Sequence, residues 1–282
     1  MPLLLCLMAL APSLVPAQDS IAPPVLLLKS EFLKPGRAGT PHEKTEAAYV
    51  AAAKAGKAPF HYIAMTSMNG ADRALFMSGY PTFAAALEAE GKMGDKNPTA
   101  GAALDRALVA DGELLASASS SQWMYQPELS LHAQGNLVGV RYIEIQEVIV
   151  KPGREQEAFE WFKMYVDGHK DLPGANWAAF HQIYGSNLNT FIFITRVKSP
   201  SETDTEWGFN VKAFIAKLGA AQLKKIQDLE REFTEVEWTN VYRISPEMSL
   251  PTEEMIKAEP SFWSPTPASV DKTPAPATAG KP

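Results

Sequence analysis

Residues 138–154 read VGVRYIEIQEVIVKPGR, an alternating apolar and polar run that ends in a Pro-Gly turn. Residues 25–37 read VLLLKSEFLKPGR and follow the same design. The two copies of Lys-Pro-Gly-Arg begin at Lys34 and Lys151, 117 residues apart. A strand-like run that ends in the same four-residue turn therefore occurs once in each half of the 282-residue chain.

Three further matches occur in the same order in both halves, with offsets of 119 or 120 residues. They are Phe60-His61 with Phe180-His181, Pro81-Thr82 with Pro200-Ser201, and residues 127–131 (PELSL) with residues 246–250 (PEMSL). Ordered matches at a nearly constant offset predict two homologous halves. Each copy is far longer than a solenoid repeat, so each half is expected to be a domain.

Each half is predicted to have the order strand, helix, strand, strand, helix, strand. The predicted elements of the first half are residues 25–33, 42–54, 60–67, 73–80, a helical region within 82–116, and 120–125; those of the second half are 138–150, 155–169, 176–184, 190–197, 209–233 and 236–244. This order is typical of a ferredoxin-like domain, in which both helices cover one face of an antiparallel sheet. We therefore expect an α+β fold with two tandem ferredoxin-like domains, residues 18–131 and 132–250. Their bare sheet faces would pack together and close a pseudo-dimeric α/β barrel.

Two β-α-β-β-α-β units that each open with a strand running into Lys-Pro-Gly-Arg resemble the dimeric α/β-barrel superfamily. The pattern is most similar to its NIPSNAP-like and antibiotic-biosynthesis-monooxygenase-like domains, and it covers residues 25–250. The superfamily includes cofactor-independent oxygenases, haem-degrading and haem-binding enzymes, isomerases and members with no known activity, so the fold does not choose the function. Its haem-degrading members use an Asn, a Trp and a His. Asn176, Trp177 and His181 lie near one strand here but do not align with that motif, so those roles are not carried over.

The composition and the two ends of the chain restrict its location and partners. A net charge of −6 gives no basic field for a nucleic acid, so no such partner is expected. Residues 1–17 form an apolar run too short to span a bilayer, followed by a small-residue cleavage pattern. This run predicts a signal peptide, export to the periplasm or the exterior, and no transmembrane span in the mature protein; the alternative is a buried N-terminal segment. The only cysteine, Cys6, lies in this run, and residues 251–282 are expected to form a Pro-rich, largely disordered tail.

The most polar central strand face is that of residues 142–150, where Tyr142, Glu144 and Gln146 alternate with isoleucines. We expect the isoleucines to face the helices and the polar side chains to face the barrel lumen. A carboxylate there would be partly desolvated, so Glu144 is the candidate general base, with Tyr142 and Gln146 as ligand-binding residues. The alternative is a structural role for Glu144, at a sheet edge or paired with Arg141 or Arg243.

His61 and His181 occupy equivalent positions in the two halves and are candidate catalytic residues, related by the pseudo-twofold axis. Two facing imidazoles could shuttle protons or bind a metal or haem. The alternative is a pair of inherited structural histidines, and because no third ligand lies at a recognisable spacing, no metal site is predicted. Trp177, Tyr184 and Tyr62 are the candidate aromatic lining of a ligand pocket, although such residues are more often core.

These features favour an exported protein whose barrel cavity binds a small apolar or aromatic molecule. The catalytic interpretation is a monooxygenase or isomerase that needs no tightly bound cofactor, with haem as an open alternative. The competing hypothesis is a non-catalytic structural or protein-interaction module whose barrel is filled by side chains. Neither the substrate nor any further oligomerisation follows from the sequence.

Overall fold

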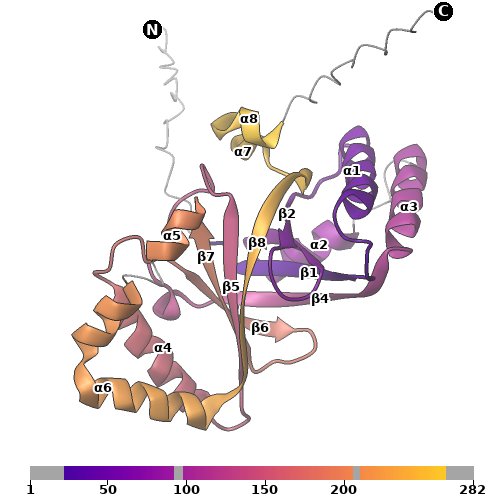
Figure 1. Cartoon of the computed structure of the whole chain (residues 1–282). Coiled ribbons are helices and arrows are strands. Elements are labelled where there is room, and N and C mark those ends of the chain that lie inside the picture. Colours follow the sequence, from indigo (N-terminus) through magenta and orange to yellow (C-terminus); the bar gives the residue numbers. More distant parts are fainter. Residues whose placement is uncertain (1–21, 92–97, 206–209, 265–282) are drawn as a thin grey trace, which may run out of the picture.

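The computed structural model describes residues 22–91, 98–205 and 210–264. Within them, eight antiparallel strands form one closed barrel in the order β1-β3-β2-β8-β5-β7-β6-β4 (Figure 1). The strands are β1 (Val25–Leu33), β2 (Tyr62–Ser67), β3 (Arg73–Tyr80), β4 (Leu115–Tyr125), β5 (Tyr142–Val150), β6 (Ala178–Tyr184), β7 (Thr190–Val197) and β8 (Thr234–Leu250). The α+β class and the closed barrel are therefore confirmed.

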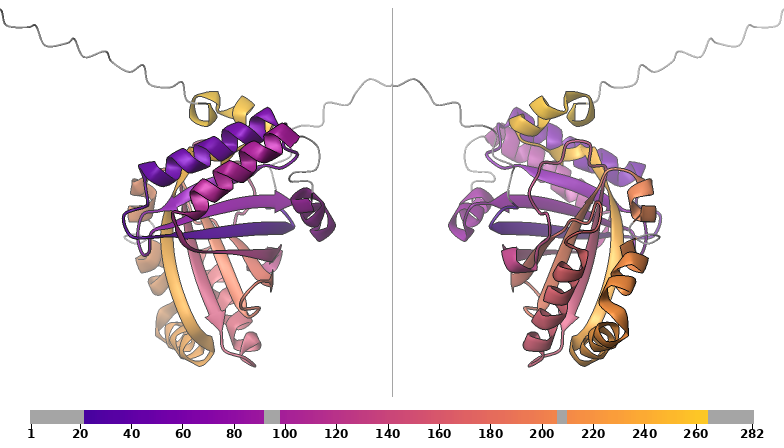
Figure 2. Two further views of the ribbon diagram at one scale, coloured as in Figure 1. Left: turned by 90° about the vertical axis from the view of Figure 1, so that its right-hand side faces the viewer. Right: turned by 90° about the vertical axis from the view of Figure 1, so that its left-hand side faces the viewer.

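Helices cover the outside of the barrel in two pairs. In the first half, α1 (Thr40–Ala55) packs against α3 (Pro98–Gly112), and in the second half α4 (Glu155–His169) packs against α6 (Val211–Phe233). Figure 2 shows the two pairs on different sides of the barrel. The shorter helices are α2 (Phe83–Gly91), the 3₁₀ turn η1 (Pro127–Leu129), α5 (Pro200–Thr205), α7 (Glu253–Ala258) and α8 (Pro260–Trp263). None of the helices in the described ranges is long and apolar enough to cross a membrane.

The order β-α-β-β-α-β occurs in both halves, with extra helices inserted. Helix α4 and strand β7 have the predicted bounds, while the region 82–116 is divided into α2 and α3. The two Pro-Gly turns adopt the same left-handed conformation, with φ of 74° at Gly36 and 79° at Gly153. They also make matching backbone hydrogen bonds to the end of the second helical region, from Lys34 N to Leu114 O and from Lys151 N to Phe233 O.

Two strand pairings join the halves and close the barrel. Strand β2 pairs with β8, with Met65 opposite Ile244, and β4 pairs with β6, with Met124 opposite His181. Each seam therefore contains one strand from each half. Each half contributes four adjacent strands, and the barrel closes only when the two four-stranded sheets pair at both seams.

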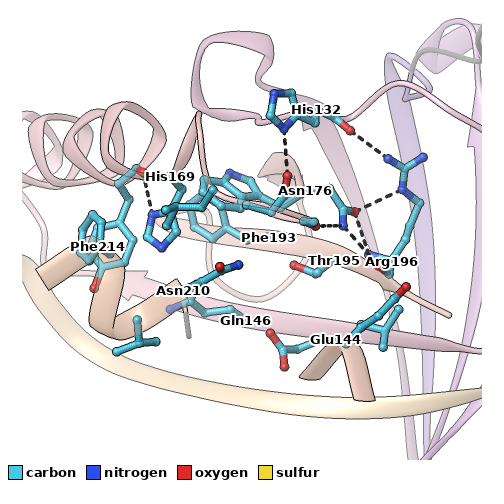
Figure 3. A pocket seen from close by; sticks show the side chains of 18 of the residues that line it. His132, Glu144, Gln146, His169, Asn176, Phe193, Thr195, Arg196, Asn210 and Phe214 are labelled. Atoms are coloured by element: carbon cyan, nitrogen blue, oxygen red, sulfur yellow. Dashed lines mark hydrogen bonds between the residues drawn. The ribbon is translucent and has the colours of Figure 1, made fainter. Parts of the chain in front are cut away.

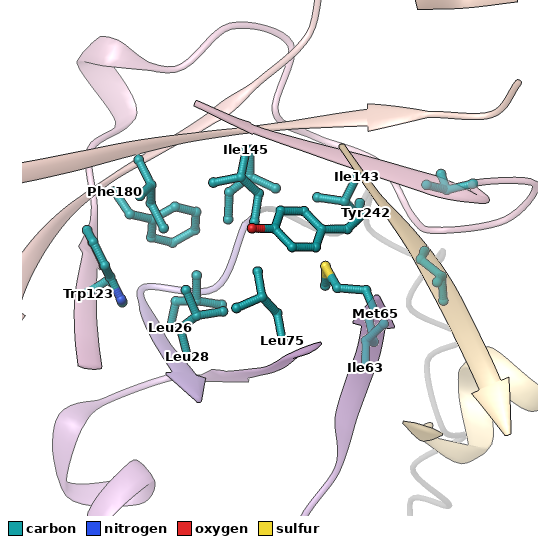
Figure 4. Close-up of a cluster of buried hydrophobic side chains, with 14 of the residues drawn as sticks. Leu26, Leu28, Ile63, Met65, Leu75, Trp123, Ile143, Ile145, Phe180 and Tyr242 are labelled. Atoms are coloured by element: carbon teal, nitrogen blue, oxygen red, sulfur yellow. The ribbon is translucent and has the colours of Figure 1, made fainter. Parts of the chain in front are cut away.

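Apolar side chains from all eight strands meet inside the barrel (Figure 4). The buried members on the strands are Leu26, Leu28, Ile63, Met65, Leu75, Trp123, Ile143, Ile145, Phe180, Ile192, Ile194, Tyr242 and Ile244. An eight-stranded barrel has an interior just wide enough for side chains to fill. This part of the lumen is therefore a packed core.

The isoleucines of β5 face this core, so the prediction that Tyr142, Glu144 and Gln146 face the lumen is wrong. Ile143 and Ile145 belong to the lumen cluster, whereas Val148 packs with the α4 and α6 side chains on the outer face. Both faces of this strand are covered, one by helices and one by the opposite wall of the barrel. Strand alternation separates two faces without telling which is inside, and the more apolar face is the one that lies in the lumen.

Helices α7 and α8 lie against one end of the barrel core, as Figure 1 shows. Trp263 is 3% exposed and belongs to the lumen cluster, with Phe262, Met255 and Ile256 packed against it. Arg141 on the barrel rim forms an ion pair with Glu259 and stacks over the Phe262 ring at 3.9 Å. The predicted tail thus begins as an ordered cap; its remainder, 265–282, and the predicted signal segment 1–17 lie outside the described residues.

Candidate ligand-binding cavity

The outer face of the second-half sheet and the helices α4 and α6 enclose a cavity of about 1030 Å³ (Figure 3). The sheet contributes Glu144 and Gln146 from β5, Phe193 and Thr195 from β7, and Thr239 from β8; the helices contribute Trp161, Phe162, Tyr165, His169 and Phe214. Aromatic side chains come mostly from the helices, whereas polar side chains come from the strands, from α5 and α6, and from the loops that carry His132 and Asn176. We call the ring-lined part on α4 and α6 the apolar wall, and the polar strand residues that face it the polar wall.

The apolar wall is a stack of rings on α4 and α6. His169 stacks on Phe214 with ring centroids 4.2 Å apart, and Trp161 stacks on Tyr165 at 4.0 Å. The His169 Nδ1 atom lies 2.9 Å from the Tyr165 carbonyl oxygen, so this nitrogen is the hydrogen-bond donor. That bond fixes the tautomer and the orientation of the ring.

Gly168 allows the two helices to approach this closely. A Cβ atom at this position would lie 2.1 Å from Cε2 of Phe214, well inside van der Waals contact. The lack of a side chain at Gly168 thus places the Phe214 ring against His169.

The polar wall ends at a guanidinium held by neutral oxygen atoms. Arg196 on β7 donates from Nη2 to the backbone oxygens of His132 and Gln134, at 2.9 and 3.0 Å. The Asn176 side-chain oxygen accepts from the Arg196 backbone N–H at 3.2 Å. Burial lowers the pKa of Arg196, but an arginine keeps its charge in proteins. The cavity thus has a positive charge at its rim.

Carboxylates lie on the floor of the cavity. Gln146 donates from Nε2 to Glu237 Oε1 at 2.6 Å. Glu144 lies two residues before Gln146 on β5, so the two side chains point to the same outer face of the strand. Glu144 is half-buried and lines the cavity. A partly desolvated carboxylate in such a place can accept a proton from a bound ligand.

Three of the predicted site residues, Glu144, Gln146 and Trp177, line this cavity. Trp177 packs edge-on to His169 at 5.6 Å and donates from Nε1 to the Leu129 carbonyl. They meet on the outside of the barrel instead of in its lumen. Tyr142 does not line this cavity; its ring faces the Arg243 guanidinium at 5.9 Å.

The two predicted histidines do not share a site. Strands β2 and β6 lie on opposite sides of the barrel, four strands apart in either direction. His61 is exposed just before β2, and His181 on β6 points outward, where it stacks on Phe191 at 4.4 Å. Its Nε2 lies 2.8 Å from the Leu188 carbonyl oxygen, and burial lowers the pKa of His181. The repeated motif thus gives one exposed histidine before β2 and one outward-pointing histidine on β6, so the two cannot face one another.

The other two predicted residues lie away from this cavity. Tyr184 is 61% exposed and contacts Phe83 edge-on at 6.0 Å. Tyr62 lines a second cavity, of about 460 Å³, between the outer face of the first-half sheet and its helices. The second cavity also includes Lys29 and Glu46, which the sequence patterns did not indicate.

His169, Phe214 and Arg196 are residues of the first cavity that the sequence patterns missed. Both helices were predicted, with His169 at the end of one and Phe214 on the apolar face of the other. The sequence did not show that these two helices cover the polar face of β5. Arg196 gave no signal, because its partners come from a loop that follows η1.

A closed barrel of eight antiparallel strands, four from each half, with helices packed outside it, has the architecture of a dimeric α/β barrel, here within one chain. Solved structures with the same fold include a candidate monooxygenase from Fusobacterium nucleatum subsp. nucleatum ATCC 25586, with a TM-score of 0.51 and 14% identity over 79% of this chain and 93% of that chain. An anthrone oxidase-like protein has a TM-score of 0.51 and 12% identity over 78% of this chain and 91% of that chain.

A candidate monooxygenase from Lactobacillus acidophilus NCFM has a TM-score of 0.46 and 10% identity over 79% of this chain and 94% of that chain. No protein-family model matches the sequence, and a search of curated proteins gives no match. At these identities the likeness extends to the fold alone. No comparison supports the narrower NIPSNAP-like resemblance.

Proposed function

We propose that the cavity between the second-half sheet and helices α4 and α6 binds a small aromatic molecule with a phenolic or other acidic group. The observation that carries this proposal is the division of the cavity into a ring-lined wall and a polar wall with a guanidinium at its rim. Aromatic rings stack favourably with Trp161, Tyr165 and His169. An oxyanion on the ligand would be stabilised by Arg196.

The reaction that this arrangement supports best is a monooxygenation that needs no resident cofactor. Glu144 would take a proton from the ligand, and the electron-rich anion would react directly with dioxygen. Conversion of a ring CH₂ group to a carbonyl uses one O₂ and releases one water, so one oxygen atom enters the product and the two hydrogens leave with the other. The names of the similar structures, two candidate monooxygenases and an anthrone oxidase-like protein, are consistent with this chemistry.

Ligand binding can be measured by quenching of tryptophan fluorescence, since Trp161 and Trp177 line the cavity. With anthrone-type and phenolic probes, Arg196→Gln should weaken binding by about 10- to 100-fold, because a charge-assisted hydrogen bond is lost. Arg243→Gln is the matched control, because Arg243 is exposed and lies outside the cavity. Equal affinity in the wild type and Arg196→Gln would contradict the proposed ligand orientation.

Oxygen uptake distinguishes an enzyme from a binding protein. Glu144→Gln should lower kcat by about 100-fold or more while the ligand Kd changes little, as expected for loss of a general base. Probe binding with no oxygen uptake in the wild type would favour a non-catalytic carrier.

Haem binding is a further candidate, because the His169 ring is held by its Nδ1 hydrogen bond in the manner of a metal-ligating histidine. Haem, when bound, would supply redox chemistry, and His169 would hold the iron. The absorption spectrum of the purified protein with added haem tests this function. A spectrum that His169→Ala leaves unchanged would exclude His169 as the ligand.

We infer two further properties from the sequence and the element order. The two halves descend from one duplicated ferredoxin-like unit, as their matching turn contacts suggest. The chain is exported, because residues 1–17 have the composition of a signal peptide. N-terminal sequencing of the protein recovered from its native cell envelope or medium should begin at Gln18; an intact Met1 would contradict export by this route.

A further inference from the structure

Four ionisable side chains form a buried cluster in the first half, outside the second-half cavity. Glu31 comes from β1, His42 and Glu46 come from α1, and Asp111 comes from α3. Their exposed fractions are between 1% and 5%. Three separate elements therefore bring one imidazole and three carboxyl groups to the same point.

A single nitrogen atom lies at the centre of this cluster. His42 Nε2 is 3.1 Å from Glu31 Oε2, 3.3 Å from Asp111 Oδ1 and 4.0 Å from Glu46 Oε1. The Thr45 hydroxyl also donates to Asp111 Oδ1, at 2.7 Å. One N–H group and one neutral hydroxyl still leave three carboxylates short of positive charge, and buried charges without partners are costly. The nearby positive group is Lys29, whose Nζ lies 2.6 Å from Glu31 Oε1. Lys29 and a protonated His42 would still leave one of three carboxylates without a counter-charge.

The pKa values of the carboxyl groups reflect this burial and this shortage of positive charge. Burial, together with the charges of Glu31 and Asp111, raises the pKa of Glu46 to about 8. Burial also raises the pKa of Asp111. Burial acts in the same direction on Glu31, but the hydrogen bond from His42 and the charge of Lys29 bring the pKa of Glu31 below its usual range.

A second, independent observation points to a ligand beside the cluster. The Tyr62 hydroxyl is buried and has no hydrogen-bond partner within the described part of the chain. Tyr62 lines the second cavity together with Glu46 and Lys29. The cluster therefore adjoins a space that contains an unsatisfied polar atom, and that space gives an ion a route to Glu46.

Among the described residues of the second half, no such cluster lies at the equivalent place. When the two Lys-Pro-Gly-Arg turns are aligned, Glu31 corresponds to Val148. Val148 is fully buried in an apolar core with Phe162 and Ala158. The first half thus has a buried carboxylate at the position where the second half has an apolar side chain, and a buried carboxylate is destabilising unless it has a partner.

The four ligand atoms all lie within 4.8 Å of one another. Metal–ligand distances of about 2.0–2.2 Å place ligand atoms about 3–4 Å apart, so small side-chain shifts would bring all four into contact with one ion. We propose that Glu31, His42, Glu46 and Asp111 bind one divalent first-row transition-metal ion. One imidazole and three carboxylates suit Mn²⁺, Fe²⁺ or Zn²⁺ better than a soft ion such as Cu⁺. The ion would link β1, α1 and α3, with Glu46 at the side open to the second cavity.

The full-length protein, stripped with a chelator, should bind one Co²⁺ per chain with visible ligand-field absorption, and Zn²⁺ and Mn²⁺ should compete for the site. Glu46→Gln and Asp111→Asn should each weaken Co²⁺ binding by at least about 10- to 100-fold, the range already seen when only an outer partner of a metal ligand is lost. The matched control is Glu144→Gln, which removes a carboxylate from the other cavity and should bind Co²⁺ as the wild type does.

No Co²⁺, Zn²⁺ or Mn²⁺ binding by the wild type would overturn the proposal. Unchanged affinity in both Glu46→Gln and Asp111→Asn would do the same. Circular dichroism of the metal-free variants shows whether each is folded. Should the variants not fold, anomalous diffraction from wild-type crystals soaked in Mn²⁺ decides: a peak between the four side chains supports the site, and a peak elsewhere or none rules it out.

Discussion

His181 is the residue whose titration has the clearest consequence for stability. Its ring is stacked on Phe191, and burial lowers its pKa, so the folded state prefers the neutral form. The unfolded chain binds a proton at about pH 6.5, whereas the folded chain does so only at lower pH. The stability that depends on neutral His181 is therefore complete above about pH 6.5 and is lost as the pH falls through the lowered folded-state pKa.

Urea unfolding at about pH 7.5 and about pH 5.5 tests this dependence. The wild type should lose more free energy of unfolding on acidification than His181→Gln does. His61→Gln is the matched control, because His61 is exposed and its removal should leave the pH dependence of the wild type in place. The same pH dependence in the wild type and His181→Gln would show that the half-buried imidazole has no part in it.

At the residue scale, the sequence indicated some of the residues that line a cavity but not the side of the sheet on which they lie. Glu144, Gln146 and Trp177 were predicted to line a cavity inside the barrel, whereas the cavity that they line is on the outer side of the sheet. The cluster around His42 was not predicted at all. Its members come from three elements, and no short spacing in the sequence connects Glu31 with Asp111.

At the scale of elements, the close approach of α4 and α6 depends on Gly168. A Cβ there would lie 2.1 Å from Phe214, so the ring or the helix must move. Overpacking of this kind costs about 1–3 kcal/mol, which exceeds the gain of at most ~1 kcal/mol from replacing a helical Gly by Ala. We expect Gly168→Ala to lower the free energy of unfolding by about 1–2 kcal/mol and to weaken ligand binding in the adjacent cavity.

Chemical denaturation measures this loss, and Gly112→Ala in α3 is the control, because its Cβ would meet no atom within 4 Å. The double variant Gly168→Ala/Phe214→Leu should be less destabilised than the sum of its single variants, since the smaller side chain relieves the contact. Additive effects would mean that the added methyl group at position 168 does not clash with the Phe214 ring.

The elements themselves were largely readable from periodicity. Helix α4 and strand β7 match their predicted bounds because each has a clear period and a turn signal at its ends. The inner and outer faces of β5 were exchanged because both are covered. Ile143 and Ile145 face other strands across the lumen, a contact that depends on barrel closure and that no single strand reveals.

At the scale of the whole molecule, closure of the barrel makes the two halves depend on each other. The lumen core contains Leu28 and Met65 from the first half and Ile145 and Tyr242 from the second. A separated half would expose its share of that core, together with one unpaired edge at each seam. The repeat in the sequence was sufficient to predict a closed barrel, but whether its lumen is open or filled depends on the side chains of both halves at once.

Because each half covers the lumen core of the other, neither half is expected to fold alone. When residues 22–131 and 132–264 are produced as separate chains, each should form aggregates or pair with its own copy, because the apolar lumen face cannot stay in water. Co-expressed, the two chains should purify as a one-to-one complex with the far-UV circular dichroism of the intact protein. The cut lies in the loop between η1 and β5, so no strand or helix is broken. Size-exclusion chromatography with light scattering gives the answer: a half that is a stable, folded monomer by itself would show that the barrel is not one cooperative unit.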